Sequence, residues 1–256
     1  ADGGVRGVLA CGSDVTAQVA ARLELERERE LRERFVATLS HDLRTPLSSA
    51  RLGAEMINDA AVSPDVTRSA VRITRNIDRA DRMLQDLLDV SRIKAGERLP
   101  LEATEGDLVA IAEDVLRELT ALHGDRFVVC GAHRLVGRWS ASGIRRIVEN
   151  LCSNAVKYGA SDTPVTVTIR AHAGLATIAV HNVGTPIPAV DIPSLFEPFR
   201  RVGSAEVAGH RSWGLGLTLV RGVAEAHDGH VAVTSSAAEG TTFTVTLPIA
   251  RDQDGG

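Results

Sequence analysis

A histidine followed at once by an aspartate is the pair in this sequence best suited to nucleophilic chemistry. His41 lies two positions from Leu39 and two from Leu43, which belong to an apolar stripe of helical spacing. At a helical period the ring points about 200° away from that stripe, so we expect it to be exposed. Asp42 can accept a hydrogen bond from one ring nitrogen, which leaves the lone pair of the other free to attack an electrophile.

Pro46 follows the histidine closely and is expected to disturb the helix that carries it. Proline has no backbone N–H and its ring crowds the carbonyl of residue 42, so we expect a kink beside His41. From its position alone, a solvated surface histidine would be the better interpretation. Exposure, an adjacent carboxylate and a local kink together favour a nucleophile that a separate domain must reach.

Two asparagines and a lysine share one face of a second predicted helix. In RRIVENLCSNAVKYG, residues 145–159, Asn150 and Asn154 stand four apart, Lys157 follows one turn later, and Ser140 is a suitable N-cap. Amide carbonyls suit Mg²⁺ as hard oxygen ligands, and Lys157 supplies a positive charge for a triphosphate. An ordinary amphipathic helix with two asparagines on its polar face would explain the helix without any ligand.

Glycines and basic residues lie where a phosphate-binding segment would need them. In SWGLGL, residues 212–217, Gly214 and Gly216 precede a predicted helix, so backbone N–H groups can approach phosphates there. In LFEPFRR, residues 195–201, the two phenylalanines fit anchoring contacts. The two arginines fit either phosphate neutralisation or a solvated pair.

Composition argues against several other classes of protein. The 256 residues are 44% hydrophobic and 24% charged, which is ordinary for a soluble protein long enough for two domains. A net charge of −4 without a basic run gives no footprint for nucleic acid, and no apolar run within this chain could span a bilayer. Cys11, Cys130 and Cys152 lack metal-ligand spacing and an even count, so we expect small buried side chains in a reducing compartment.

A helical hairpin must position the histidine. Residues 15–34 are highly charged with opposite charges at helical spacing, which predicts a helix that pairs with a copy of itself or leads into a bundle. Apolar residues recur every three or four positions over 35–57 and again over 66–91, on either side of a break that contains Pro64. Such a hairpin cannot bury both faces alone, so we expect two copies to form an antiparallel four-helix bundle.

The asparagine helix and the glycine-rich segments belong to a region that alternates helical and strand patterns, which predicts a layer of helices on one mixed sheet. No regular element is expected over 184–213, a length typical of a lid. The predicted helices are near 107–123, 140–158 and 214–227, and the predicted strands near 126–131, 134–139, 164–172, 175–182, 229–235 and 241–248.

The segment FVATLSHDLRTPLSSARL closely resembles the phosphoacceptor motif of sensor histidine kinases in two-component systems. The resemblance implies that His41 is phosphorylated, that Asp42 is its acid/base partner, and that Thr45 positions water for the reverse activity. RRIVENLCSNAVKYG looks like the N box of the family's ATP-binding domain. HNVGTPIP, LFEPFRR, SWGLGL and EGTTFTVTLP then follow in the order of the family's later boxes.

The same resemblance implies a nucleotide site that departs from the family pattern at three positions. Asn182 replaces the aspartate that accepts a hydrogen bond from the adenine amino group, a loss of roughly 1 kcal/mol because charge assistance is gone. Pro186 replaces the second glycine of that box, and Ser212 stands where a further glycine is common. The implied nucleotide-binding residues are Asn150, Asn154, Lys157, Tyr158, Asn182, Gly184, Ile187, Phe199, Arg200, Gly214, Leu215, Gly216, Leu217 and Thr241, with Asn154 as the Mg²⁺ ligand.

These patterns predict an α+β protein, a dimeric antiparallel four-helix bundle followed by an α/β sandwich that binds ATP. The first fifteen residues resemble the end of a PAS sensory domain. The expected parts are the end of a PAS-like domain over 1–14, a coiled-coil signalling helix over 15–34, a dimerisation and phosphotransfer hairpin over 35–96, a catalytic ATP-binding domain over 97–250 and a disordered tail over 251–256.

The function implied is Mg-ATP-dependent autophosphorylation of His41 in a homodimer, followed by phosphoryl transfer to an aspartate of a response regulator. An upstream PAS domain and a cytoplasmic location are expected, with an upstream membrane anchor left open. Two alternatives stay open: an ATPase of the gyrase or MutL kind, which lacks a phosphoacceptor bundle, and a pseudokinase that acts as a dimeric scaffold or phosphatase. The pseudokinase alternative stays open because the sequence departs from the family pattern at Asn182, Pro186 and Ser212.

Overall fold

The computed structural model describes residues 43, 47–57, 64–199 and 214–249. These residues belong to two units, one within 1–81 and one within 82–256, and each is described by itself. Several predictions lie outside the described residues: the PAS-like end, the coiled-coil helix, the tail, and the residues His41, Asp42, Thr45, Arg200, Ser212 and Cys11.

The first unit contains two helical segments, as the hairpin prediction required. Residues 47–57 are helical, and α2 (Pro64–Lys94) begins two residues earlier than its apolar pattern indicated. Residues 82–94 of α2 belong to the second unit. Pro64 is the first residue of α2, where a missing N–H costs nothing because no partner exists for it. Arg51 lies 3.8 Å from Glu55 and 3.9 Å from Asp78, so an ion pair joins the two helices.

Much of the apolar surface of this hairpin is uncovered in a single chain. Leu52 and Met56 are 59% and 67% exposed, and they lie outside the predicted apolar stripe. Leu43, Ile57, Val66 and Ile73 are also exposed. No helix in the described part of the chain has both the length and the apolar character needed to cross a membrane.

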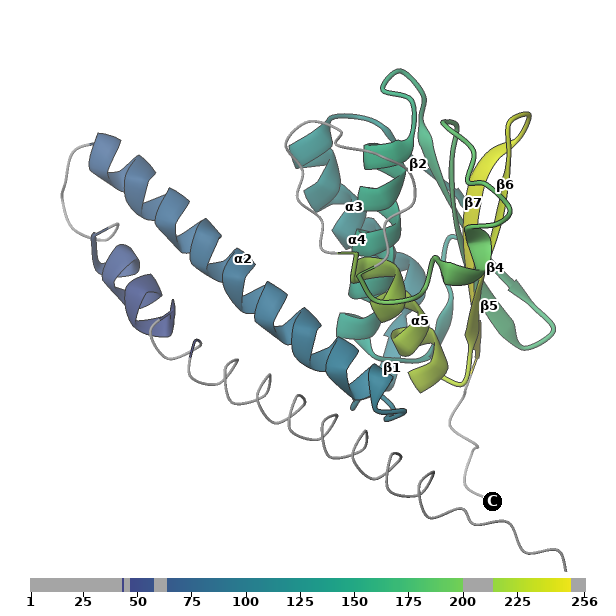
Figure 1. The fold of residues 1–256 in the computed structure, drawn as a ribbon, viewed down its shortest axis with the longest axis horizontal. Helices are drawn as coiled ribbons and strands as arrows, with labels where there is room; N and C mark the ends of the chain where they lie inside the picture. Colours follow the sequence, from purple (N-terminus) through teal and green to yellow (C-terminus); the bar gives the residue numbers. More distant parts are fainter. Residues whose placement is uncertain (1–42, 44–46, 58–63, 200–213, 250–256) are drawn as a thin grey trace, which may run out of the picture. The chain divides into compact units, whose positions relative to one another are not determined.

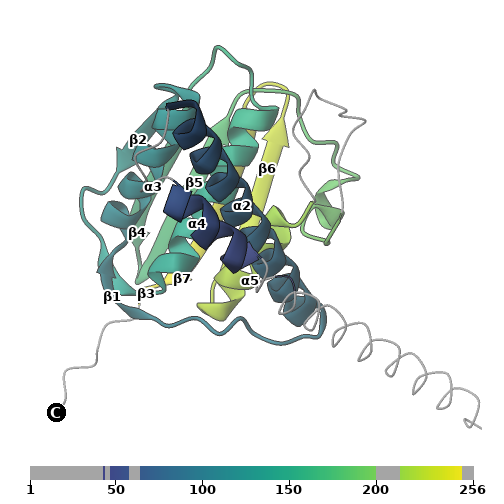
Figure 2. The same ribbon diagram turned by 90° about the vertical axis from the view of Figure 1, so that its left-hand side faces the viewer.

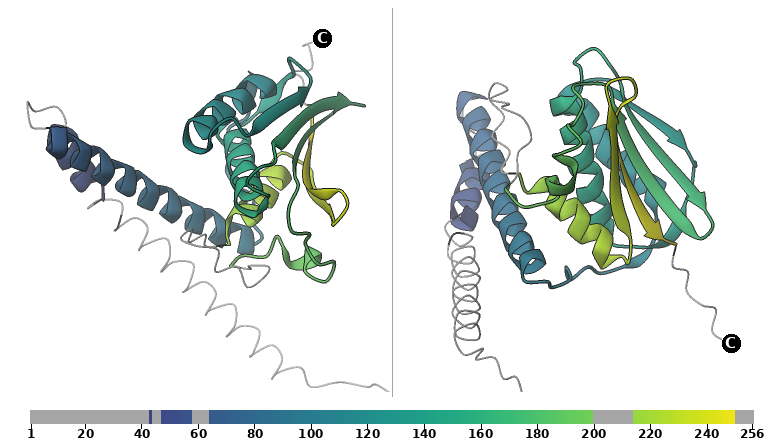
Figure 3. Two further views of the ribbon diagram at one scale, coloured as in Figure 1. Left: turned by 90° about the horizontal axis from the view of Figure 1, so that it is seen from above. Right: turned by 45° about the vertical axis from the view of Figure 1, so that its right-hand side comes forward.

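The second unit is built on a five-stranded mixed sheet of order β2-β4-β5-β7-β6, in which only β2 and β4 run parallel. Three helices cover one face of this sheet and leave the other face bare (Figure 1, Figure 3). Figure 2 views the helical layer face-on, with the strands behind it. The helices are α3 (Leu108–His123), α4 (Ala141–Tyr158) and α5 (Gly216–Ala226), and the strands are β2 (Phe127–Gly131), β4 (Val165–His172), β5 (Leu175–Asn182), β6 (His230–Ser236) and β7 (Gly240–Pro248).

The prediction of one sheet was wrong for the strand expected over 134–139. That strand, β3 (Val136–Trp139), pairs with β1 (Thr104–Asp107), which the sequence analysis missed, in a separate two-stranded sheet. Side chains cause this pairing: the buried Trp139 donates from Nε1 to the Gly106 carbonyl at 2.9 Å. Asp107 accepts from the backbone N–H of Leu135 and of the second residue of α3. The polar sequence TEGD of β1 has no alternating apolar pattern, so these residues form a strand only because of these tertiary contacts.

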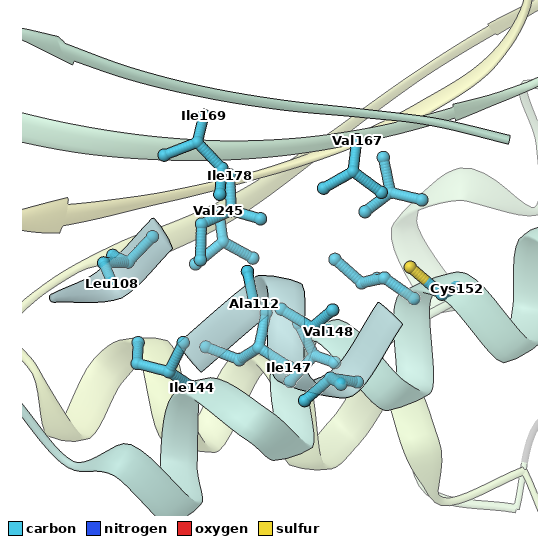
Figure 4. Close-up of a cluster of buried hydrophobic side chains, with 14 of the residues drawn as sticks. Leu108, Ala112, Ile144, Ile147, Val148, Cys152, Val167, Ile169, Ile178 and Val245 are labelled. Carbon is cyan, nitrogen blue, oxygen red and sulfur yellow. The ribbon is translucent and has the colours of Figure 1, made fainter. Parts of the chain in front are cut away.

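The core lies between the three helices and the covered face of the sheet (Figure 4). Strands β4, β5 and β7 alternate buried and partly exposed positions, as half-buried strands should. Ile144, Ile147 and Val148 of α4 meet them from the other side. The burial predicted for cysteines is confirmed for Cys152 but wrong for Cys130, which is exposed because β2 is an edge strand.

Candidate nucleotide-binding site

Helix α4 positions the asparagines predicted to bind phosphate and metal. The Ser140 side chain caps its first turn by accepting from Gly143 N at 3.2 Å, as predicted. His227 fixes the same end, because its Nε2 accepts from the Ser140 backbone N–H at 3.0 Å while its Nδ1 lies 2.8 Å from the Val223 carbonyl. With one face of α4 buried in the core, the asparagine face remains partly exposed.

The end of α4 crosses the segment that follows β5. Gly159 and Gly184 form an isolated antiparallel bridge, and Ala160 N donates to Val183 O at 2.8 Å. A Cβ atom at Gly159 would lie 2.4 Å from the Ala155 carbonyl oxygen, and one at Gly184 would lie 2.4 Å from the carbonyl oxygen of the residue before Gly159. Both glycines are therefore needed for the crossing, which brings the N box and the HNVGTPIP segment together.

Two buried polar residues lie beside this crossing. Asn182 and Thr241 are partners in the register of β5 and β7, and they are 6% and 5% exposed. Thr241 Oγ1 shares a 2.7 Å hydrogen bond with Ser235 Oγ, which also accepts from Ile187 N at 2.9 Å. The Asn182 side chain makes no hydrogen bond with any residue that the structure describes. The residue is largely buried, but its amide is not among the fully buried side-chain groups without a partner in the described part of the chain, so the amide can be reached from outside.

The glycine pair at the start of α5 lies against the asparagine face of α4. Gly214 has a φ of 70°, which favours glycine, and α5 begins at Gly216. A Cβ atom at Gly216 would lie 2.4 Å from Asn150 Oδ1, while Asn150 Nδ2 donates to the carbonyl of residue 146 at 2.8 Å. Gly216 thus keeps the Asn150 amide oxygen at the N-terminus of α5, a relation that helical spacing alone could not show.

The other predicted nucleotide residues divide into a rim and a packed group. Lys157 Nζ lies 2.9 Å from the Tyr158 hydroxyl and 4.7 Å from its ring centroid, at the exposed end of α4. Leu215 is buried against Leu219, and Leu217 packs against the main core. These two leucine side chains therefore face protein, and only their backbone groups can serve a phosphate.

The phenylalanines of LFEPFRR behave differently from each other. Phe196 anchors the segment, as expected: its ring packs edge-on against Phe243 with centroids 6.4 Å apart, and its carbonyl accepts from Thr218 Oγ1 at 3.0 Å. Phe199 is 48% exposed with a φ of 64°, and Lys94 Nζ lies 5.2 Å from its ring centroid. One short 3₁₀ turn, Ile192–Ser194, interrupts a stretch predicted to have no regular element.

Two family models match the chain. Residues 31–96 match the His Kinase A (phospho-acceptor) domain, and residues 140–251 match the histidine kinase-, DNA gyrase B-, and HSP90-like ATPase domain. The chain belongs to the sensor histidine kinases. The first match argues against the gyrase-type alternative, because that alternative has no phosphoacceptor domain.

Relatives of this kinase carry names consistent with the family. The chain is 32% identical over 231 residues to the sensor-like histidine kinase SenX3 of Mycolicibacterium smegmatis, covering 88% of this chain and 59% of that protein. It is 30% identical over 229 residues to the sensor protein CutS of Streptomyces coelicolor, covering 88% and 55%. The chain therefore spans a little over half the length of these relatives. Full-length ShkA in complex with AMPPNP shares the fold, with a TM-score of 0.65 and 22% identity over 85% of this chain and 46% of that one.

A charged cluster that was not predicted from the sequence joins the C-terminal part of α2 to α4. Arg146 Nη1 lies 2.5 Å from Asp89 Oδ2, its Nη2 bonds Asp86, and Gln85 Nε2 donates to Asp89 Oδ1 at 3.2 Å. Burial alone would lower the pKa of Arg146, but hydrogen bonds to the two carboxylates and their charges outweigh it and the pKa is raised. Helical spacing placed Arg146 on a polar face, and nothing in the sequence indicated its partners.

Proposed function

We propose that this chain is the core of a kinase that uses Mg-ATP to phosphorylate its own His41 and then passes the phosphoryl group to an aspartate of a response regulator. The observation that carries the nucleotide part is the Asn182 side chain, which belongs to a residue only 6% exposed, has no hydrogen-bond partner among the described residues and lies beside the Gly159–Gly184 crossing. The match of residues 31–96 to a phospho-acceptor domain supports a histidine as the acceptor.

The residues around the crossing fit a nucleoside triphosphate. Asn182 and Thr241 would bind the adenine, with Tyr158 and Ile187 at its edge and the phosphates near the N-terminus of α5. Asn154 would hold Mg²⁺ through its amide oxygen, since the ion accepts few protein ligands and keeps phosphate oxygens and water. When bound, Mg²⁺ would offset the negative charge of the phosphates. The remaining predicted residues are Asn150 and Lys157 at the phosphates, with Gly184, Phe199, Arg200, Gly214, Leu215, Gly216 and Leu217 around the base and the lid.

The phosphoryl transfer needs little beyond positioning and electrostatics. A ring nitrogen of His41 attacks the γ-phosphorus, the bond to the bridging oxygen breaks and ADP leaves. Asp42 orients the ring and shares its proton. Thr45 would position water in the reverse activity, in which the phosphorylated regulator is hydrolysed.

We further propose that two copies pair through the hairpin. The exposed Leu43, Ile57 and Ile73, which belong to the predicted apolar stripes, support this pairing, since a second hairpin would cover the apolar surface that one chain leaves open. An upstream PAS-like domain, continued by a coiled coil over 15–34, would pass its signal into this dimer. Because the substrate is ATP, we place the reaction in the cytoplasm.

Incubation with γ-labelled ATP and Mg²⁺ tests the proposal directly. We expect a label that is stable to alkali, lost in acid, and absent from the variant His41→Gln. The matched control is His172→Gln, which removes an exposed histidine at the end of β4 and should label normally. Equal labelling of His41→Gln and the wild type would refute the histidine as acceptor.

Nucleotide titration separates the kinase from the pseudokinase alternative. An active kinase should bind ATP more tightly with Mg²⁺ than without it, and Asn154→Ala should remove most of that difference. A wild-type chain that binds nucleotide and never labels would support the scaffold or phosphatase function instead.

A further inference from the structure

Asn182 is the least satisfied polar group beside the proposed base site. Its residue is 6% exposed, yet its side chain makes no hydrogen bond to the part of the chain that the structure describes. Its partner in the sheet register, Thr241, bonds Ser235 Oγ through Oγ1 at 2.7 Å, and no hydrogen bond joins the two side chains of Thr241 and Asn182. On the other side lies Gly159, where a Cβ atom would be 3.3 Å from Asn182 Nδ2.

These surroundings leave the orientation of the amide undecided. A primary amide carries an acceptor oxygen and a donor NH₂ of nearly equal size, and rotation about the last side-chain bond exchanges them. A described hydrogen bond to either atom would select one orientation, and Asn182 has none. Its side chain can therefore present either a donor or an acceptor to a ligand at little cost.

Purine bases differ at the edge that such an amide would meet. A 6-aminopurine offers a donor at its exocyclic nitrogen and an acceptor at N1, whereas a 6-oxopurine offers an acceptor at O6 and a donor at N1. An amide matches the first in one orientation and the second in the other. A carboxylate only accepts, so it matches the amino group and opposes O6.

We propose that Asn182 makes this kinase tolerant of the purine base, so that its site takes 6-oxopurine triphosphates as well as ATP. The inference rests on the proposed function, because it assigns the base specificity of the same site. The transfer step is unchanged in atoms: the γ-phosphoryl group moves to His41, the ring proton is released, and the nucleoside diphosphate leaves.

Inosine triphosphate is the appropriate probe, because it carries O6 and N1–H but no 2-amino group that could clash with the pocket. We would measure the Kd of Mg-ATP and Mg-ITP by competition with a fluorescent nucleotide, and labelling of His41 from the γ-labelled form of each. For the wild type we expect the two Kd values to agree within about tenfold, which is one hydrogen bond's difference. For Asn182→Asp we expect ITP to weaken relative to ATP by about 10- to 100-fold, because an acceptor then faces an acceptor.

A matched control carries the same substitution away from the proposed site. Asn76 is exposed on α2, and Asn76→Asp should leave the ratio of the two Kd values unchanged. If the wild type binds ATP and labels His41 but discriminates against ITP more than 100-fold, the inference fails and the proposed function stands. If Asn182→Asp leaves the ratio of the ITP and ATP Kd values unchanged, the inference also fails and the proposed function stands. A wild type that binds neither nucleotide refutes both.

Discussion

Removing the positive charge of Arg146 should destabilise the second unit more than any single surface change. Arg146 and Asp89 have side chains only 21% and 7% exposed, so Arg146→Met leaves a buried carboxylate without its cation. Breaking a buried pair costs about 3–5 kcal/mol. Asp86 is 35% exposed and contributes under about 1 kcal/mol because water screens it. Gln85 still donates to Asp89 in the variant, so we expect a loss near the lower limit, about 3 kcal/mol.

Urea unfolding of the full chain, followed by circular dichroism and the fluorescence of the buried Trp139, measures this loss. Because the pKa of Arg146 is raised, its stabilisation is present at every pH below the ordinary arginine value and would be lost only above it. The decrease in unfolding free energy caused by Arg146→Met should therefore be the same at pH 6 and pH 8, since Arg146 is charged at both.

The neighbouring arginine supplies the matched control. Arg145 lies 2.8 Å from Glu118, but the two side chains are 37% and 63% exposed, so Arg145→Met should cost at most about 0.5 kcal/mol. The double variant Arg146→Met, Asp89→Leu should be more stable than Arg146→Met alone, because the carboxylate that remains, Asp86, is 35% exposed and the buried one is gone. A loss below about 1 kcal/mol in Arg146→Met, or no recovery in the double variant, would show that the cluster is solvated and that the reasoning is wrong.

Three further predictions concern the core and the α4–α5 contact. Burial raises the pKa of Cys152 to about 12, so the thiol ionises at a lower pH in the unfolded chain than in the folded one. The unfolding free energy should therefore fall by up to about 1.4 kcal/mol per pH unit between about pH 9 and 12. In urea titrations Cys152→Ala should remove that part of the pH dependence, and an equal pH dependence in the variant and the wild type would contradict the prediction. A maleimide reagent at pH 7, mapped by mass spectrometry, should modify Cys130 and spare Cys152. Gly216→Ala should displace Asn150 and weaken Mg-ATP binding about tenfold in a Kd measurement, while the unfolding free energy changes by less than about 1 kcal/mol; unchanged affinity would separate Gly216 from the site.

Local pattern was sufficient to predict most elements of the catalytic region. Helices α3, α4 and α5 and the strands of the five-stranded sheet all lie within a few residues of their predicted limits, because each has a regular apolar period against one core. The pattern failed at β1, whose four residues carry no apolar alternation and become a strand only through Trp139 and Asp107. It also failed for Cys130, since periodicity cannot tell an edge strand from a central one.

Contacts between distant segments were beyond prediction for a related reason. A helical period tells which side of α4 carries Arg146 or Asn150, and it does not tell what lies opposite. The partners of Arg146 precede it by 57 and 60 residues, and the partner of Asn150 is a glycine that the sequence suggested only as a phosphate ligand. These contacts decide how α2 and α5 are held against the asparagine helix.

Asn182 shows how the same residue changes meaning once its surroundings are known. In the sequence, an asparagine in place of an aspartate is a loss of charge, and it predicts weaker adenine binding by roughly 1 kcal/mol. In the structure, the amide has no hydrogen-bond partner among the described residues, so its second functional group becomes relevant. A carboxylate has only acceptors, whereas the amide adds a donor that no described residue occupies. The substitution is therefore better understood as an exchange of base selectivity for tolerance than as damage to the site.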